Sequence, residues 1–73
     1  MIGERAKVVM ERLISLYQKH PQGGMAIDTE KVTQIVRGDP EAVAFCLRKA
    51  IDGGFASQIG WGLWLTVAYV FEQ

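Results

Sequence analysis

The sequence predicts an α+β domain in which three helices pack against a small antiparallel β-hairpin. Apolar residues recur at spacings of three and four in three successive segments, which is typical of helices with one buried face. The second and third segments are separated only by Gly38 and Asp39, so the two helices must meet at a sharp corner. Beyond Gly54, residues of two alternating sets lie on both sides of a glycine-flanked loop at 60–62, as in a hairpin. A chain of 73 residues has room for one core, and residues 1–73 are expected to form a single domain.

The first helix is expected to cover residues 4–19. Its apolar residues fall on one face: Ala6, Val9, Met10, Leu13, Leu16 and Tyr17. It cannot continue through His20, because Pro21 disfavours the helical conformation of the residue before it. After a loop, residues 25–27 are too few for a helix and could add one short strand.

The second and third helices carry clear start and stop signals. Asp28 or Thr29 can cap the second helix, and Gly38 ends it. Its buried face consists of Val32, Ile35 and Val36. For the third helix, expected at 40–52, Asp39 provides the N-cap and Pro40 suits the first helical position. Gly53 and Gly54 supply a permissive backbone just beyond its end, and its buried stripe is expected to contain Val43, Leu47, Ala50 and Ile51.

The hairpin is expected at 55–66. Phe55, Ser57 and Ile59 alternate with more polar or smaller residues before the loop, and Leu63 and Leu65 alternate after it. The loop glycines tolerate the left-handed backbone that a three-residue hairpin connection requires. Residues 67–71 are apolar on both faces of a strand, and 67–73 could be either strand or a short helix capped by Thr66; strand continuation is preferred.

Composition excludes several classes of site. Eight basic and eight acidic side chains leave no net charge, so no overall field attracts nucleic acid or an anionic membrane. Cys46 is the single cysteine, which rules out an internal disulfide, and no cysteine and histidine cluster predicts a bound metal. No segment is long and apolar enough to span a bilayer, and the N-terminus does not resemble a secretory signal. The expected compartment is therefore the cytoplasm.

Catalysis is not indicated, and no cofactor or small-molecule substrate is expected. The only conceivable nucleophile and base are Cys46 and His20, but Cys46 lies within an apolar helical run, where a thiol is usually inert packing. The glycines at 60–62 lack the longer fingerprint of a phosphate-binding loop. The acidic residues lie where helix caps and first turns favour them: Asp28, Glu30, Asp39 and Glu41.

The element order, the pattern V-xxx-L-xx-A-xxx-GF from Val43 to Phe55 and the closing GLWLT resemble the winged helix-turn-helix family. In that family the second helix of the turn unit enters the major groove, and the hairpin wing contacts the backbone or minor groove. The resemblance implies that 40–52 is a recognition helix, that 55–66 is a wing, and that the chain is a small transcriptional regulator bound to double-stranded DNA. The candidate DNA-contact residues are Lys31, Arg37, Glu41, Ala44, Phe45, Arg48, Lys49, Gln58 and Trp61.

A second hypothesis is a protein-interaction module. The outward positions early in the third helix hold no Arg, Asn or Gln that could pair with base edges, and the expected wing tip has no cation. Phe45 could be buried at the core edge or serve as an exposed anchor, and Arg48 and Lys49 could simply favour the negative end of a helix dipole. An apolar C-terminal quarter suggests a homodimer, with candidate interface residues Trp61, Trp64, Tyr69 and Phe71.

Overall fold

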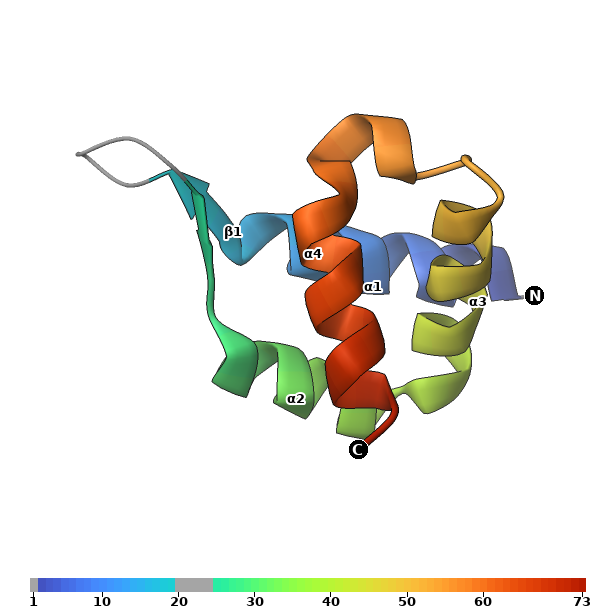
Figure 1. The fold of residues 1–73 in the computed structure, drawn as a ribbon. Coiled ribbons are helices and arrows are strands. Elements are labelled where there is room, and N and C mark those ends of the chain that lie inside the picture. Colours follow the sequence, from blue (N-terminus) through green and yellow to red (C-terminus); the bar gives the residue numbers. More distant parts are fainter. Residues whose placement is uncertain (1, 20–24) are drawn as a thin grey trace.

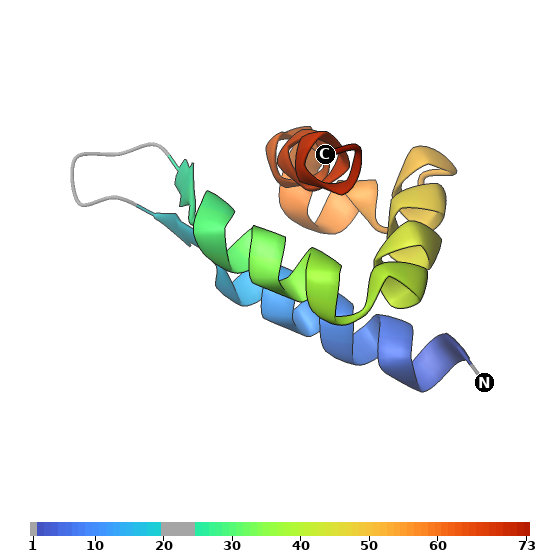
Figure 2. The same ribbon diagram turned by 90° about the horizontal axis from the view of Figure 1, so that it is seen from below.

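The chain folds as four helices with a short two-stranded ribbon. The computed structural model describes the backbone of residues 2–19 and 25–73, and their side chains except at positions 2, 18, 19, 25 and 56–59. The helices are α1 (Ile2–Ser15), α2 (Thr29–Gly38), α3 (Pro40–Ile51) and α4 (Ala56–Phe71), and the strands are β1 (Tyr17–Lys19) and β2 (Met25–Ile27). Helices α1 and α2 lie side by side, α3 turns away at the end of α2, and α4 packs against α2 and α3 (Figures 1 and 2).

The predicted α+β winged helix-turn-helix fold is wrong. Residues 55–66, expected to form the wing hairpin, belong mostly to α4, which continues through residues 67–71, where strand was preferred. The segment is apolar on every side, so a period of two and a period of 3.6 fit it equally well in the sequence. The helical period prevails because it places Leu63, Trp64 and Val67 on one face, and that face is buried against the other helices.

The expected hairpin loop is instead a break within α4. Gly60 has φ 71° and ψ 168°, a backbone conformation that is essentially restricted to glycine. The glycine therefore has the unusual conformation that its place in the sequence suggested, but it joins two helical segments rather than two strands. The chain keeps coiling on both sides of this kink, at the top of the molecule in Figure 1.

The first helix is shorter than predicted. It ends at Ser15 rather than at residue 19, because Tyr17–Lys19 pairs antiparallel with Met25–Ile27 in the register Tyr17 with Ile27 and Lys19 with Met25. The short strand expected at 25–27 is present, and its partner is β1 rather than a wing. The ribbon leads away from the helices (Figure 1), and His20 lies outside the described residues.

The sharp corner between α2 and α3 is confirmed, and it consists of Asp39 alone. The Asp39 backbone N–H donates to the Ile35 carbonyl and ends α2, while its carboxylate accepts from the Ala42 N–H and begins α3. Pro40 follows at the first helical position, as the sequence indicates. The same carboxylate accepts two hydrogen bonds from the Arg5 guanidinium of α1, so the corner is also fixed to the first helix.

The end of α3 is also close to the predicted place. The Gly53 N–H donates to the Ala50 carbonyl and the Gly54 N–H to the Lys49 carbonyl, which together form a Schellman motif. Gly53 has φ 92°, a left-handed conformation that favours glycine. Because both bonds are local, the sequence was sufficient to locate this helix end.

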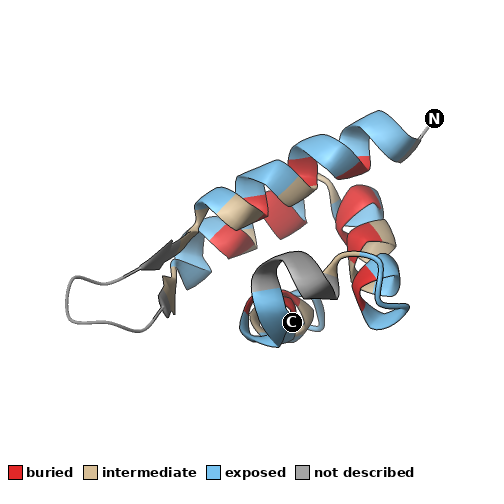
Figure 3. Cartoon of the chain, turned by 90° about the horizontal axis from the view of Figure 1, so that it is seen from above, coloured by how far each residue is buried: buried red, intermediate tan, exposed pale blue. Residues whose placement is uncertain are grey.

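The core lies where the four helices meet (Figure 3). Its buried residues are Ala6, Val9, Leu13, Val32, Ile35, Val36, Ala42, Val43, Cys46, Ala50, Leu63, Trp64 and Val67. The predicted stripe of α2 is fully buried, but that of α3 is shifted: Leu47 is half-buried and Ile51 is exposed. The shift arises because α1 and α4 both pack on α3, so its buried side centres on Cys46. Trp64, the largest core side chain, stacks on Phe55 with ring centroids 6.1 Å apart.

No helix among the described residues is long and apolar enough to cross a membrane.

The helical state of α4 predicts unequal effects at two leucines. In a strand Leu63 and Leu65 would share a face, whereas here Leu63 is fully buried and Leu65 is 67% exposed. We expect Leu63→Ala to lower the free energy of unfolding by about 2–5 kcal/mol, and Leu65→Ala to change it by less than about 0.5 kcal/mol. Urea unfolding at low protein concentration measures both. Equal losses at the two positions would contradict the helix.

Candidate functional site

Helix α4 presents two apolar faces. The inner face holds buried Leu63, Trp64 and Val67, while the outer face carries Trp61, Leu65 and Tyr69, which are 51%, 67% and 68% exposed. The outer three are spaced four residues apart and therefore form one line along the helix, which we call the α4 ridge. A helix that is apolar on both faces is usually buried on both. The α4 ridge is therefore the surface that we expect a binding partner to cover.

Nothing charged interrupts this ridge. Residues 56–71 contain no Asp, Glu, Lys or Arg. Small or short side chains flank the ridge at Gly62, Thr66 and Ala68, and the Thr66 hydroxyl donates to the Gly62 carbonyl of its own helix at 3.0 Å. Because that hydroxyl is already bonded, the flanks add little polarity, and another backbone could approach the ridge closely.

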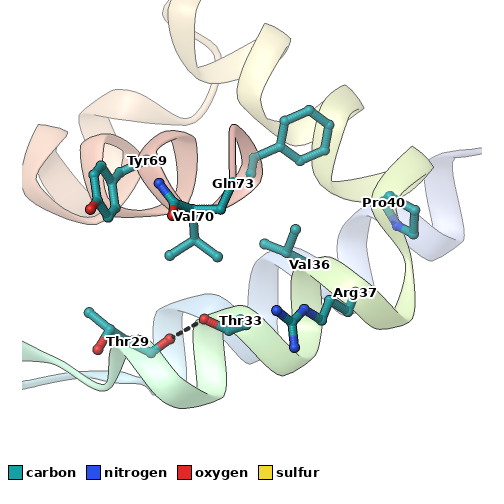
Figure 4. A pocket seen from close by; sticks show the side chains of 9 residues that line it. Thr29, Thr33, Val36, Arg37, Pro40, Tyr69, Val70 and Gln73 are labelled. Atoms are coloured by element: carbon teal, nitrogen blue, oxygen red, sulfur yellow. Dashed lines mark hydrogen bonds between the residues drawn. The ribbon is translucent and has the colours of Figure 1, made fainter.

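A groove between α2 and the end of α4 continues the ridge at Tyr69 (Figure 4). It encloses about 590 Å³ and is lined by Thr29, Thr33, Val36, Arg37, Pro40, Tyr69, Val70, Phe71 and Gln73. The Thr33 hydroxyl donates to the Thr29 carbonyl, so it is already bonded within α2. Arg37 is the single charged side chain in this lining. The groove is thus mainly an apolar cleft with one cation at its edge.

The candidate DNA-contact residues do not gather on one face. Arg37 lines the α2–α4 groove, whereas Lys31 lines a separate shallow hollow between α1 and α2 together with Arg12. Arg48 and Lys49 are exposed in the last turn of α3. Trp61 lies on the α4 ridge, and the side chain of Gln58 lies outside the described residues. With the wing absent, the predicted backbone contact from 55–66 loses its structural basis.

The outer side of α3 carries both signs of charge. Helical spacing places Glu41, Arg48 and Asp52 on this side, away from the buried face. Ala44 and Phe45 are half-buried, and the Lys49 ammonium lies 5.6 Å from the centroid of the Phe45 ring. This is the geometry of a cation–π contact. Of the two alternatives for Phe45, the structure therefore shows a side chain at the core edge, with Lys49 over its ring.

The N-terminal part of α3 is also occupied by an ion pair. Arg5 binds Asp39 through two nitrogens, and its Nη1 lies 3.3 Å from the Glu41 carboxylate. The hydrogen bond from Arg5 is the main cause that holds the pKa of Asp39 below its usual range, assisted by the bond from the Ala42 N–H. Glu41 is thereby engaged within the chain rather than presented freely to a ligand.

Of the candidate interface residues, Trp64 belongs to the core, while Trp61, Tyr69 and Phe71 are exposed. Leu65, at the centre of the ridge, was missed. The sequence has apolar residues at 61, 65 and 69, but these lie on one face only if the segment is a helix.

Cys46 does not have the setting of a nucleophile. It is fully buried, its thiol donates to the Ala6 carbonyl at 3.4 Å, and burial raises its pKa to about 11. At neutral pH the sulfur is therefore protonated, and the thiolate that would react is almost absent.

No protein-family model, curated protein or solved structure matches the chain, so these comparisons do not show which family it belongs to.

The Arg5–Asp39 pair predicts a pH-dependent contribution to stability. Because the folded-state pKa of Asp39 is lowered, the contribution is present above the unfolded pKa of about 3.9 and is lost as the pH falls through the folded value. We expect Asp39→Asn to be less stable than the wild type at pH 7, and the difference to shrink below about pH 4. Thermal unfolding across this pH range measures it.

Asp28→Asn provides the matched control. Asp28 caps α2 by accepting from the Lys31 N–H, and none of the hydrogen bonds and ion pairs of the described residues joins it to an arginine. If Asp28→Asn and Asp39→Asn lower the free energy of unfolding equally at pH 7, the Arg5–Asp39 ion pair adds no stability beyond that of a carboxylate at an N-cap.

Proposed function

We propose that this chain is a protein-interaction module that binds its partner through the α4 ridge. The observation that carries the proposal is the exposure of Trp61, Leu65 and Tyr69 in one line on a helix without charged residues. Tryptophan and tyrosine are the side chains most often found at the energetic centre of protein interfaces. The sequence-based interaction hypothesis placed the binding surface on the third helix and the wing, whereas this proposal places it on the outer face of α4.

The size of the ridge supports the proposal. Aromatic side chains bury about 150–250 Å² each when fully covered, and half to two-thirds of the three ridge side chains is open. The ridge therefore exposes on the order of 300–400 Å² of side chain, the size of the largest apolar patch on a typical monomer, which is often functional. Single exposed apolar residues elsewhere, such as Val8 and Ile51, do not form such a line.

The α2–α4 groove adds a second contact region beside the ridge. Tyr69 belongs to both, so a partner lying along α4 could also place a side chain between Val36 and Val70. Arg37 at the edge of the groove would favour an acidic group on that partner. A reducing cytoplasm is the proposed compartment, as is usual for a chain with one unpaired thiol.

Photo-crosslinking tests the proposal. We expect Leu65→benzoylphenylalanine, in the full chain within its native cells, to form a discrete covalent adduct on irradiation, because the side chain lies at the centre of the ridge. Lys7→benzoylphenylalanine is the matched control, since Lys7 is exposed on α1 away from the ridge. The adducts are resolved by mass. No more adduct from position 65 than from position 7 would overturn the proposal.

DNA binding stays the competing prediction, and one feature favours it. Helices α2 and α3 meet at a sharp corner, with Arg48 and Lys49 exposed near the end of α3. Against it stands the exposed carboxylate of Asp52 at the end of α3, near Arg48 and Lys49, which would repel phosphates.

A titration of labelled duplex DNA at two salt concentrations separates the two functions. If the chain is an interaction module, we expect no salt-dependent binding, and no difference between the wild type and Arg48→Ala/Lys49→Ala. Binding that weakens steeply with salt and is lost in the double variant would instead support the DNA function, because phosphate contacts release counterions.

A further inference from the structure

We propose that the partner on the α4 ridge is a second copy of this chain, packed antiparallel about a two-fold axis at Leu65. This inference rests on the proposed function and names its partner. It follows from the spacing of the ridge, from its charges and from its area.

The ridge is symmetric about its centre. Trp61 and Tyr69 each lie four residues from Leu65, so a two-fold axis through Leu65 places Trp61 of one copy against Tyr69 of the other, twice. Leu65 then meets Leu65. With a rise of about 1.5 Å per residue, the two rings of one ridge are about 12 Å apart along the helix. The spacing of the three side chains is therefore compatible with a two-fold axis.

The charges select the antiparallel direction. Glu72 follows directly after α4 and is exposed. Parallel packing would bring together the two Glu72 carboxylates and the two negative helix ends, whereas antiparallel packing separates them and pairs each C-terminus with an N-terminus. Because residues 56–71 carry no charge, no like charges oppose one another along the rest of the contact.

The area suits a weak, reversible dimer. Two ridges that expose on the order of 300–400 Å² each supply about half of a standard interface of roughly 1,600 Å². This area is below the roughly 1,000 Å² of a stable specific interface, so a weak, transient dimer is expected rather than a permanent complex.

Sedimentation of the purified full chain tests the dimer. We expect the wild type to pass from monomer to dimer as its concentration rises through the micromolar range, and Leu65→Glu to stay monomeric. Leu65 is exposed and glutamate is a good helix former, so this variant should fold normally. Val8→Glu is the matched control, because it places the same charge at an exposed apolar position of α1 and should dimerise like the wild type.

A short bismaleimide crosslinker tests the direction of packing. We expect Leu65→Cys to crosslink with itself, and a mixture of Trp61→Cys with Tyr69→Cys to yield mainly the mixed product. The native Cys46 is buried and protonated, so it should not interfere. Crosslinking of Trp61→Cys with itself, and of Tyr69→Cys with itself, would overturn the antiparallel arrangement.

The two proposals can fail separately. A wild type that stays monomeric at all concentrations would overturn the dimer. In that case, a benzoylphenylalanine adduct whose mass is not twice that of the chain would leave the interaction function standing, with a different partner. Absence of any adduct would remove both.

Discussion

The structure depends on Asp39, the one residue between α2 and α3. Its backbone N–H completes α2, its carboxylate accepts from the first turn of α3, and the same carboxylate binds Arg5 of α1. Three helices are therefore oriented by one residue whose polar groups are all engaged. The buried faces of these helices then converge, and α4 completes the core that they form.

Helix α4 completes this core with only half of its apolar surface. Leu63, Trp64 and Val67 fill the space between α2 and α3, and a single helix cannot bury its opposite side in the same way. Among the described residues, no other helix or strand covers that side. The α4 ridge is thus a consequence of building a four-helix core with an uncharged last helix, and exposed aromatic residues in this position favour association.

The charged residues support the fold more clearly than they mark a nucleic-acid site. Arg5 is paired with Asp39 and Glu41, Lys49 covers Phe45, and Arg37 stands at the edge of an apolar groove. Their positions were evident from the sequence, but their grouping was not, because contacts between α1 and α3 join residues more than thirty positions apart. Candidate residues could be named from the sequence, whereas the surface they belong to depends on how the helices pack.

Local signals sufficed for α2, α3 and the corner between them. The caps and the glycines after α3 act through hydrogen bonds to residues within five positions, and Pro40 acts through its fixed φ. They also sufficed for the short strand at 25–27, but not for its partner, which ended α1 earlier than its apolar pattern suggested. For residues 56–71 the local pattern fits a strand and a helix alike, and Gly60 permits a turn or a kink. Packing against α2 and α3 decided between them, because only a helix buries Leu63, Trp64 and Val67 together while leaving Leu65 outside.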